Sequence, residues 1–479
     1  MKICLVAEGC YPYMVGGVSS WVHSMIQAWP QVEFVLLAVI ADRTLSGQFK
    51  FELPQNLTAV YEVYLNDKDW AHRKHTKRRT RLRAKEYKAL QSIVSGDDVD
   101  WDTVFNMFQK KRFSIDDLLM GGDFLRIVED YYQKRYPYIG FSDFLWTMRS
   151  IYLPLFRVLQ TNLPKADLYH CVATGYAGVL GSMAAFLYGG GLVISEHGIY
   201  TREREEELLK AEWVAGIYKN VWMDQFQKMS RLAYDRADVV TCLYGRAGKL
   251  QREMGCAPEK IRVTPNGIVT ERLERLPGKT EEDAGYINIG AILRVTPIKD
   301  VKTMIRAFAF AKEKNSRLRL WIMGPMDEEE KYAQECVELT EALGVPDVIF
   351  TGRVDVKEYL GRMDYTILTS ISEGQPLTIL ESYAARKPVI ATDVGNCREL
   401  IYGEDDGCGT AGILTHVMNI TEISQAILEL ASSPKMREEM GECGYRRVQK
   451  RHRLQQMQQA YENIYQQVGW THQRPWGEM

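Results

Sequence analysis

The sequence lacks several features that would assign a function quickly. Its nine cysteines lie far apart, and no two form the CxxC pair of a zinc knuckle or a redox dithiol. Scattered single cysteines are typical of a reducing cytosol, where they pack as small apolar residues. An excess of one charge is also missing, because 60 Lys and Arg stand against 62 Asp and Glu. This balance removes any global electrostatic reason to expect nucleic acid as a partner.

Two glycine-containing segments lack the spacing of the phosphate-binding loops that they resemble. For LPGKT at 276–280 to end a P-loop, position 273 would have to be glycine, but it is Leu273. In the first loop, EGCYPYMVGGVSS, the glycines Gly9, Gly16 and Gly17 do not match the dinucleotide spacing GxGxxG. The sequence therefore supports neither a P-loop nor a nicotinamide cofactor.

A metal-binding motif with the right context is also missing. Asp98 and Asp100 form a DxD triplet, a pattern that can hold a divalent cation on a sugar-nucleotide diphosphate. The triplet lies in the polar stretch SGDDVDWD, with no strand-like run before it. This context favours an ordinary acidic loop, and we expect no resident metal ion.

One run is long enough to cross a bilayer, but its composition favours another structure. Residues 168–195 contain no Asp, Glu, Lys or Arg, yet they include several glycines and polar residues. We interpret the run as the strand LYHCV, the helix AGVLGSMAAFLY and the strand GLVIS, because buried parallel strands are continuous apolar runs. The N-terminus reaches Glu8 after too few apolar residues for a signal peptide. We therefore expect a cytoplasmic protein that meets a membrane only through partners.

What the sequence does contain is a repeated alternation of strand-like apolar runs and amphipathic, helix-like segments. The strand-like runs are KICLV, FVLLAVI, INIGAIL, LRLWIM, VIF, YTILT and PVIAT, and a helix is predicted from about Val18 to Ala28. Such alternation predicts an α/β protein with parallel sheets joined by right-handed crossovers. The chain of 479 residues is long enough for two such domains. A break near 265–285, rich in proline, glycine and charge, predicts domains at 1–280 and 281–450.

The alternation fails between about 66 and 165, where helix-like segments predict an insertion in the first domain. Within it, residues 71–88 place nine Lys and Arg against one Glu. We interpret this run as a solvated helix face, with anionic lipid, an acidic partner or a phosphorylated substrate as the alternatives. At the end of the chain, 451–479 carries one apolar stripe, which predicts a helix crossing back to the N-terminal domain.

The strongest constellation of candidate site residues is the segment ISEGQPLTILESYAARKPVIATDVG. Glu373 and Glu381 are separated by seven residues, Gly374 opens a turn, and Pro376 suits a first helical position. The backbone N–H groups of 375–378 would then point out of a helix N-terminus, which is a ready site for a diphosphate. We expect Glu373 on the loop to take sugar hydroxyls, and Glu381, two turns into the helix, to hold a ribose.

Two cations precede this segment in the sequence. In GAILRVTPIKD, Arg294 and Lys299 follow a predicted strand, and ligands bind at the carboxyl ends of strands in open α/β sheets. Fixed positive charges at such a place neutralise the charge that grows on a leaving diphosphate. Each residue alone is an ordinary surface charge or helix cap, whereas the ordered set indicates a site.

Taken together, these motifs resemble glycosyltransferase family 4, the retaining enzymes of the GT-B fold. The family carries an E-x7-E motif, an Arg-x4-Lys pair and a glycine pair in its first loop. It also carries a histidine after a first-domain strand, as in VISEHGIY, and a hinge similar to VTPNGIV. Three segments, EGCYPYMVGGVSSWVH, EHGIYTRERE and ISEGQPLTILES, further resemble the cytosolic glycosyltransferases of the Pel exopolysaccharide system.

The resemblance implies a fold, a reaction and a set of site residues. It implies two Rossmann-like domains with parallel sheets facing a cleft, an N-terminal acceptor domain, a C-terminal nucleotide-sugar domain and no cofactor. His197 would hydrogen-bond the sugar or the reacting centre, although a histidine there can also be a simple cap or core residue. The implied catalytic residues are His197, Arg294, Lys299 and Glu373. The implied nucleotide-sugar contacts are Gly16, Gly17, Asn266, Arg294, Lys299, Gly374, Gln375, Pro376, Leu377, Thr378 and Glu381.

The resemblance favours UDP-glucose as donor, then a UDP-N-acetylhexosamine, and a growing exopolysaccharide or another glycan as acceptor. A membrane-bound polysaccharide synthase complex is the implied partner. Two rival functions stay open from the sequence: a GT-B nucleotide-sugar epimerase, and a catalytically silent nucleotide-binding subunit. An epimerase needs a second set of acid/base carboxylates, which the sequence does not place. A silent subunit has no need of the complete set of charged residues.

Overall fold

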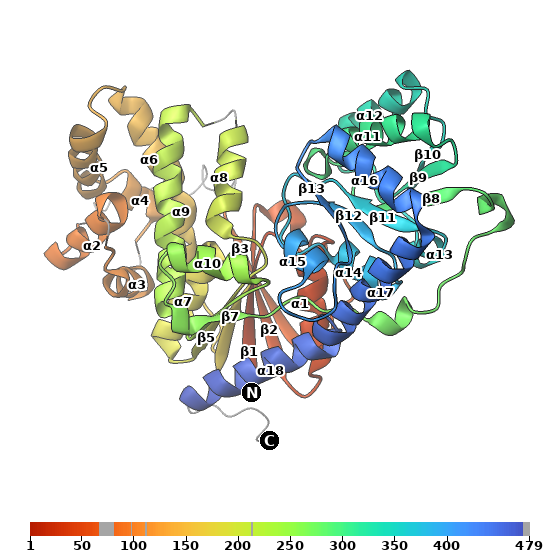
Figure 1. Ribbon diagram of the computed structural model, residues 1–479. Coiled ribbons are helices and arrows are strands. Elements are labelled where there is room, and N and C mark those ends of the chain that lie inside the picture. Colours follow the sequence, from red (N-terminus) through yellow and green to blue (C-terminus); the bar gives the residue numbers. More distant parts are fainter. Residues whose placement is uncertain (67–80, 97, 111–112, 212–213, 473–479) are drawn as a thin grey trace. The chain divides into compact units, whose positions relative to one another are not determined.

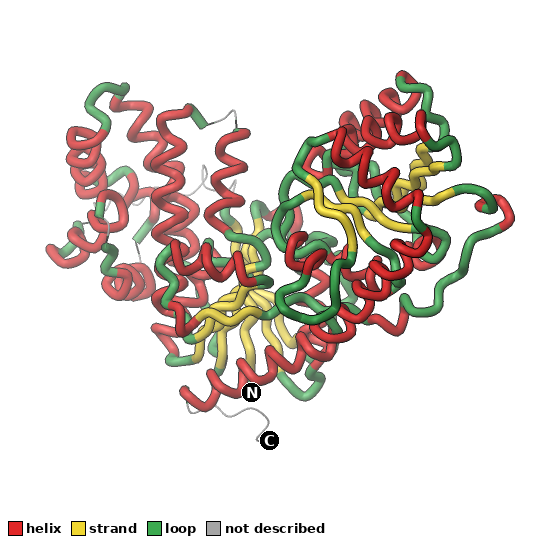
Figure 2. Tube along the Cα trace, viewed as in Figure 1, coloured by secondary structure: helices red, strands yellow, loops and turns green. Residues whose placement is uncertain are grey.

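The computed structural model describes residues 1–66, 81–96, 98–110, 113–211 and 214–472, and these form two compact units (Figure 1). The N-terminal unit comprises Met1–Val263 together with the chain end from Tyr461, and the C-terminal unit comprises Thr264–Ala460. Each unit has its own parallel sheet flanked by helices (Figure 2). The chain is therefore an α/β protein with two Rossmann-like domains.

The sheet of the N-terminal unit has the order β3-β2-β1-β4-β5-β6-β7, and every neighbouring pair is parallel. The strands are β1 (Lys2–Glu8), β2 (Glu33–Ile40), β3 (Leu57–Tyr64), β4 (Leu168–Cys171), β5 (Gly191–Glu196), β6 (Val239–Cys242) and β7 (Ile261–Val263). The central strands are buried on both faces, which explains their continuous apolar sequences.

Helices cover both faces of this sheet. They are α1 (Gly17–Ala28), α2 (Ala84–Ser95), α3 (Trp101–Lys110), α4 (Ile115–Leu119), α5 (Gly122–Arg135), α6 (Phe141–Leu159), α7 (Tyr176–Tyr188), α8 (Tyr200–Lys210), α9 (Gly216–Arg236) and α10 (Gly245–Glu253), with the short 3-10 turns η1 (Arg43–Leu45) and η3 (Pro258–Lys260). The described helices α2–α6 fill the connection between β3 and β4, so the predicted helical insertion is present. Most of the basic run, at 71–80, lies outside the described residues.

The last helix, α18 (Leu454–Thr471), contributes its second half to the N-terminal unit. There the His170 ring contacts the Tyr465 hydroxyl at 2.6 Å and the Ser195 hydroxyl at 2.7 Å. The Tyr461 hydroxyl contacts those of Ser195 and Thr241 at 3.1 and 3.0 Å. These buried polar contacts fix the helix on β4, β5 and β6, because each hydrogen bond would leave an unsatisfied group if the helix moved.

The sheet of the C-terminal unit has the order β10-β9-β8-β11-β12-β13, again with parallel neighbours. Its strands are β8 (Ile287–Ile292), β9 (Leu318–Met323), β10 (Val348–Gly352), β11 (Tyr365–Leu368), β12 (Val389–Thr392) and β13 (Gly412–Thr415). The helices are α11 (Val301–Lys314), α12 (Glu330–Ala342), α13 (Val356–Leu360), α14 (Leu377–Ala384), α15 (Cys397–Tyr402), α16 (Ile420–Ser432) and α17 (Pro434–Arg451), with the 3-10 turns η4 (Thr270–Arg272), η5 (Glu281–Asp283) and η6 (Pro297–Lys299).

Alternating strand residues of this sheet enter two hydrophobic cores. Ile367 and Ile390 pack with α11, α12 and α16 on one face. Leu368 and Val389 pack with α14, α15 and α17 on the other face. Because neighbouring residues of a strand point to opposite faces, strands with a core on both sides must be apolar throughout.

The division between the units falls at 263/264 rather than at the predicted 280/281. The first sheet ends with β7, and the segment that follows packs on the C-terminal unit, where Ile268 and Leu273 enter a core. Its proline, glycine and charged residues therefore form an ordered strap instead of a free linker. The return to the N-terminal unit likewise occurs inside α18, at Tyr461, and not at 451.

The run 168–195 forms β4, α7 and β5, as the sequence predicts. Among the described residues, none of the helices combines the length and the apolar character needed to span a membrane.

Candidate functional site

The predicted site residues of the C-terminal unit gather where its strand order reverses. In the order of the sheet, β9 lies on one side of β8 and β11 on the other, so the connections that leave β8 and β11 diverge. A crevice forms at the carboxyl ends of such a strand pair, and ligands of open α/β sheets bind there. The loops after β8 and β11 are joined by the Ile371 N–H, which donates to the Ile298 carbonyl at 2.9 Å.

An ion pair between Lys299 and Glu373 lies at the centre of these loops. The Lys299 ammonium is 2.5 Å from Glu373 Oε1, and the Ser370 hydroxyl donates to the same oxygen at 2.6 Å. Only 17% of the lysine side chain and 11% of the glutamate side chain are exposed. Among the described residues, Glu373 Oε2 has no donor, and two Lys299 protons have no acceptor. The pair therefore keeps capacity for both a sugar hydroxyl and a phosphate oxygen.

Arg294 lies apart from this pair. Its guanidinium is 2.7 Å from Glu328, on the segment between β9 and α12, and about half of the arginine side chain is exposed. An exposed pair of this kind contributes little to stability. To contact a diphosphate, Arg294 would have to exchange Glu328 for the ligand. It is therefore not the fixed, uncommitted cation expected from the sequence.

The helix predicted after Glu373 is α14, with two differences in detail. Pro376 is the N-cap and Leu377 the first helical residue, whereas the sequence predicted Pro376 as the first. No side chain caps this N-terminus, so its first N–H groups stay open to an anion. Glu381 is the fifth residue of α14, one turn in rather than two. Burial raises the pKa of its carboxyl to about 7.

A tight backbone contact fixes the turn that carries Glu373. The Asn396 N–H donates to the Gly374 carbonyl at 2.9 Å, and Gly395 has φ +51°. A Cβ on Gly395 would lie 2.2 Å from the Glu373 carbonyl oxygen and 2.3 Å from that of Gly374. Glycine is required here both by the positive φ and by this close approach.

Gly395→Ala is therefore expected to displace the Glu373 turn and to weaken nucleotide-sugar binding roughly 3- to 10-fold. Gly407→Ala is the matched control, because Gly407 also has a positive φ but no atom within 4 Å of the added Cβ. Calorimetric titration of both variants checks the effect. Equal affinities in the two variants would show that the turn does not shape the site.

Several buried polar atoms around these loops lack a hydrogen-bond partner among the described residues. They are Thr296 Oγ1, Asp300 Oδ2, Gln375 Nε2, Asn396 Oδ1 and Asn266 Oδ1. Gln375 is nevertheless held in place, because its Oε1 accepts the Asn266 N–H at 2.7 Å. Buried polar atoms without partners are rare in native proteins and require an explanation. A polar ligand at this edge supplies one.

In the N-terminal unit, Gly16 and Gly17 lie at the start of α1. Both residues are exposed, and Gly16 is the N-cap with an extended φ of 176°. Nothing lies within 4 Å of a Cβ on Gly16. The fold itself does not demand glycine at position 16, so the prediction that a ligand approaches this backbone stays a prediction.

His197 follows β5 and packs edge-on against Trp21, with ring centroids 4.6 Å apart. Its Nε2 is buried and has no partner among the described residues. Burial lowers the pKa of His197 to about 4, so the ring is neutral at pH 7. A neutral imidazole can exchange hydrogen bonds with a sugar, but it adds no positive charge for a leaving diphosphate.

The sequence analysis missed Glu8 and Glu196, the two carboxylates that end β1 and β5. Glu196 accepts hydrogen bonds from the Tyr234 hydroxyl at 2.6 Å and from Gln251 at 3.0 Å. Glu8 accepts the Ala177 N–H at 3.0 Å. Burial raises the pKa of both carboxyls. Because they accept these hydrogen bonds, both carboxylates hold the strand ends in place. The sequence signal that could have identified them is a carboxylate at the end of an apolar strand.

One aspartate of the DxD triplet, Asp100, caps the start of a helix. Asp100 Oδ1 accepts the Thr103 N–H at 3.1 Å, at the start of α3. Within the described ranges, no group of three or more His, Cys, Asp and Glu side chains is arranged to hold a metal ion.

Comparison with known families gives two matches that together cover most of the chain. Residues 1–259 match the family described as "Domain of unknown function (DUF3492)". Residues 274–447 match the family described as "Glycosyl transferases group 1". The second match contains all the candidate site residues that follow the second sheet's strands.

Individual relatives are more distant. The chain is 24% identical over 301 residues to MMP alpha-(1->4)-mannosyltransferase of Mycolicibacterium hassiacum, which covers 61% of this chain and 68% of that protein. It is 25% identical over 317 residues to alpha-maltose-1-phosphate synthase of Mycolicibacterium smegmatis, covering 60% and 76%.

Two solved structures share the fold over nearly the whole chain. Anabaena HepE in complex with UDP and glucose has a TM-score of 0.60 at 16% identity, covering 97% of this chain and 99% of that chain. Sucrose-phosphate synthase from Thermosynechococcus elongatus has a TM-score of 0.62 at 14% identity, covering 98% and 99%. The architecture is thus that of the GT-B glycosyltransferases.

Proposed function

Because the chain belongs to the family described as "Domain of unknown function (DUF3492)" and carries a glycosyl transferases group 1 domain, we propose that it is a retaining hexosyltransferase. It moves a hexose from a nucleotide sugar to a glycan acceptor. The C-terminal unit binds the donor and the N-terminal unit binds the acceptor. The observation that carries the proposal is the buried Lys299–Glu373 pair at the strand-order reversal, beside the uncapped N-terminus of α14.

The proposed chemistry uses charge stabilisation by these residues. As the bond between the sugar C1 and the diphosphate oxygen breaks, negative charge grows on the diphosphate. Lys299 and the N–H groups of Leu377 and Thr378 interact more strongly with that charge than with the intact donor, so they lower the barrier. The acceptor hydroxyl forms the new bond to C1, and its proton passes to the departing diphosphate. Retention of configuration is taken from the resemblance to family 4.

The two glutamates divide donor recognition between them. Glu381 accepts hydrogen bonds from the ribose hydroxyls, and Glu373 Oε2 accepts one from the sugar. His197, which is neutral at pH 7, hydrogen-bonds the sugar or the reacting centre. We propose UDP-glucose as the first donor and a UDP-N-acetylhexosamine as the second. The similarly folded Anabaena HepE was crystallised with UDP-glucose.

The biological setting belongs to the same proposal. The similarity of three segments to the Pel-system enzymes supports a cytoplasmic glycosyltransferase of the PelF subfamily, which extends an exopolysaccharide. Its partner would be a membrane-bound synthase complex. The sequence motifs support this subfamily, and a pull-down of membrane proteins with the tagged chain from its native host is the direct check.

The proposal is tested by donor binding and by turnover. In a thermal-shift panel of uridine, adenosine and guanosine diphosphates and their sugars, all at one concentration, we expect UDP-glucose to stabilise most. The stabilisation should be about 2.7 kcal/mol where that concentration is 100 times its dissociation constant. With an oligosaccharide acceptor, NMR should show release of UDP and a new α-linked hexose, with the same rate in EDTA. Isomerised donor without transfer would indicate an epimerase, and stabilisation without turnover a silent subunit.

A further inference from the structure

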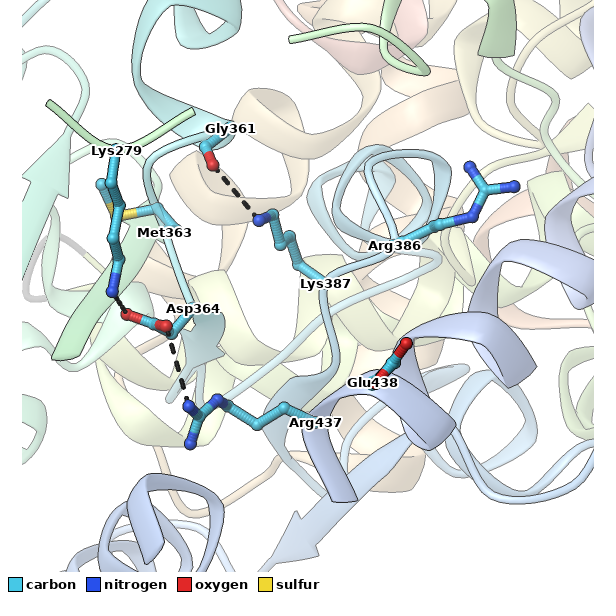
Figure 3. A pocket seen from close by; sticks show the side chains of 8 residues that line it. All are labelled: Lys279, Gly361, Met363, Asp364, Arg386, Lys387, Arg437 and Glu438. Atoms are coloured by element: carbon cyan, nitrogen blue, oxygen red, sulfur yellow. Dashed lines mark hydrogen bonds and ion pairs between the residues drawn. The ribbon is translucent and has the colours of Figure 1, made fainter. Parts of the chain in front are cut away.

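A polar pocket lies at the amino ends of the C-terminal sheet's strands, whereas the proposed donor site lies at their carboxyl ends. The cavity has a volume of about 320 Å³ and is lined by Lys279, Gly361, Met363, Asp364, Arg386, Lys387, Arg437 and Glu438 (Figure 3). Asp364 comes directly before β11 and Lys387 lies two residues before β12, so both are at the amino ends of these strands. Lys299 and Glu373 belong to loops at the carboxyl ends. The two places are therefore separate.

Positive charge exceeds negative charge among the residues that line this pocket. Four are Lys or Arg, and two are Asp or Glu. Arg386 is already neutralised, because its guanidinium is 3.0 Å from Glu442 and stacks 3.6 Å from the ring centre of Tyr445. Figure 3 shows this side chain directed away from Lys387. The remaining charged groups are the cations Lys279, Lys387 and Arg437 and the carboxylates of Asp364 and Glu438.

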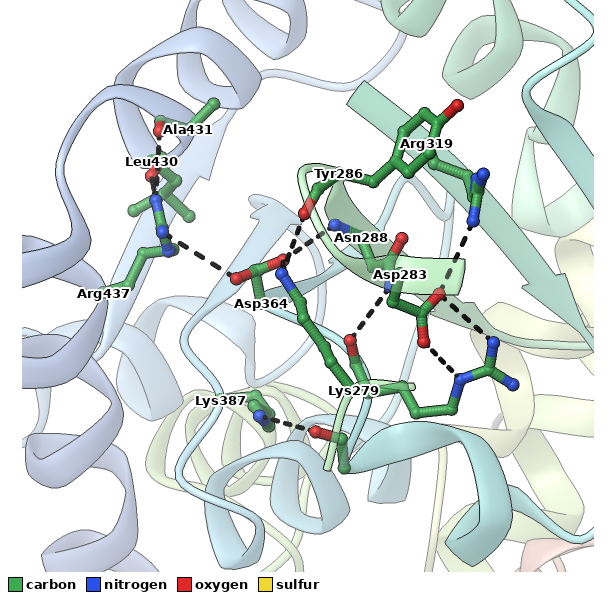
Figure 4. Close-up of polar contacts among 12 residues, drawn as sticks. Lys279, Asp283, Tyr286, Asn288, Arg319, Asp364, Lys387, Leu430, Ala431 and Arg437 are labelled. Atoms are coloured by element: carbon green, nitrogen blue, oxygen red, sulfur yellow. Dashed lines mark hydrogen bonds and ion pairs between the residues drawn. The ribbon is translucent and has the colours of Figure 1, made fainter. Parts of the chain in front are cut away.

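Asp364 forms its closest ion pair with Lys279. Its Oδ2 is 2.5 Å from the Lys279 ammonium and accepts the Asn288 N–H at 2.8 Å. Arg437 is 3.8 Å from Oδ1, at the limit of an ion pair. The arginine is fixed instead by the carbonyls of Leu430 and Ala431, at 2.5 and 3.1 Å (Figure 4). It is thus held rigidly in a position where its charge is only partly compensated.

Lys387 is the least compensated of the three. Its ammonium donates to the Gly361 carbonyl at 3.2 Å, and no carboxylate lies within ion-pair distance of it among the described residues. Burial lowers the pKa of Lys387, and the neighbouring Lys279 and Arg437 lower it further, against the opposing effect of Asp364. An anion that enters the pocket would stabilise the charged form of an ammonium in this environment.

We propose that this pocket binds the phosphate group of a small molecule, with Lys387 and Arg437 as its two main contacts. A guanidinium and an ammonium that line the same cavity can each donate hydrogen bonds to the oxygens of a phosphate dianion. The volume is at the lower limit of ligand pockets, roughly 300–1,000 Å³. It fits inorganic phosphate or a sugar phosphate and is too small for a nucleotide sugar. This site is independent of the proposed transfer reaction.

The test is calorimetric titration of the full chain with inorganic phosphate and, separately, with glucose 6-phosphate. Both titrations are run at matched ionic strength in chloride and in the presence of saturating UDP, which blocks the proposed donor site. We expect Lys387→Gln to weaken the affinity about tenfold or more, and Lys387→Arg to retain most of it. Lys435→Gln is the control, because Lys435 lies on α17 with 85% of its side chain exposed, outside the pocket.

Each outcome decides the question. Tighter binding of glucose 6-phosphate identifies a sugar phosphate as the ligand class, and tighter binding of phosphate identifies the free ion. Unchanged affinity in Lys387→Gln overturns the proposal, and so does wild-type binding no stronger than that of chloride. If Lys387→Gln fails to fold, Arg437→Gln takes its place: an affinity about tenfold weaker supports the site, and an unchanged affinity overturns it.

Discussion

Replacing Lys299 by alanine is expected to lower turnover of the nucleotide sugar about 30- to 1,000-fold. The lysine side chain is only 17% exposed, and its ion pair with Glu373 lies on the loops that precede the uncapped N-terminus of α14. A charge-assisted contact that strengthens as the leaving group forms contributes roughly 2–4 kcal/mol to the transition state. The effect should fall on kcat more than on KM, because the contact strengthens during the reaction.

The structure supplies a control that separates catalysis from folding. Lys299→Ala leaves Glu373 buried without its cation, so the single variant should also lose stability. In the double variant Lys299→Ala, Glu373→Gln the unpaired charge is gone, so the melting temperature should recover while turnover stays below that of Glu373→Gln alone. Lys302→Ala, which removes a partly exposed lysine paired with Glu335, should change neither the melting temperature nor turnover. Recovery of turnover in the double variant would assign Lys299 a structural role only.

Arg294→Ala belongs to the same experiment and should have a smaller effect. The sequence alone predicts the same range for both cations. The structure shows Arg294 in an exposed pair with Glu328, which must break before the arginine reaches a diphosphate. The expected loss is therefore near the lower end, about 30-fold. Steady-state kinetics of the two variants side by side test this order.

The sequence predicted the sheets and the donor-site loops well, because these features are local. Continuous apolar runs identify buried parallel strands, and the sequence from Glu373 to Pro376 predicts the start of a helix. The strands β3, β6, β7 and β13 were missed. Length alone is not the reason, because β4, β11 and β12 also have four residues and were predicted, whereas β3 has eight. The unit boundary was also missed, because proline and glycine in 264–280 mark turns whether or not the segment packs.

Contacts between residues distant in the sequence could not be predicted. Nothing in the local pattern pairs Lys299 with Glu373, separated by 74 positions, or Arg294 with Glu328. The same holds for Gly395, whose role depends on a backbone approach by the Glu373 turn. Residue types at the ends of strands therefore indicate where a site lies, whereas the tertiary fold decides which charges are free to act in it.

Glu381→Gln is expected to weaken binding of UDP about 10- to 150-fold at pH 8. A carboxylate that accepts hydrogen bonds from ribose hydroxyls contributes roughly 1.5–3 kcal/mol. Glu373→Gln should leave UDP affinity unchanged or slightly stronger, because it frees the charge of Lys299, but it should weaken binding of UDP-glucose. The measurement is four calorimetric titrations, two variants against two ligands. Equal losses of UDP affinity in both variants would contradict the proposed division of roles.

The raised pKa of Glu381 makes the same assignment testable by pH. Its carboxyl has a pKa of about 7 in the folded chain, so it is protonated below that pH and cannot accept a hydrogen bond on both oxygens. UDP should then bind about tenfold more weakly at pH 6 than at pH 8 in the wild type. Glu381→Gln should show only the dependence that comes from the diphosphate itself. The difference between the two pH profiles gives the contribution of Glu381 to the pH dependence of UDP binding.

Stability should change in the opposite direction to binding. A carboxyl whose pKa is raised from 4.5 to about 7 by burial favours the protonated folded state, and this contribution is lost as pH rises through 7. Well above pH 7 the ionised Glu381 therefore destabilises the ligand-free protein by about 3 kcal/mol. Glu381→Gln should unfold at a higher urea concentration than wild type at pH 8 and at nearly the same one at pH 4. A variant that is more stable yet binds UDP more weakly is the signature of a buried charge kept for its ligand, and a variant weaker in both respects would make Glu381 an ordinary structural residue.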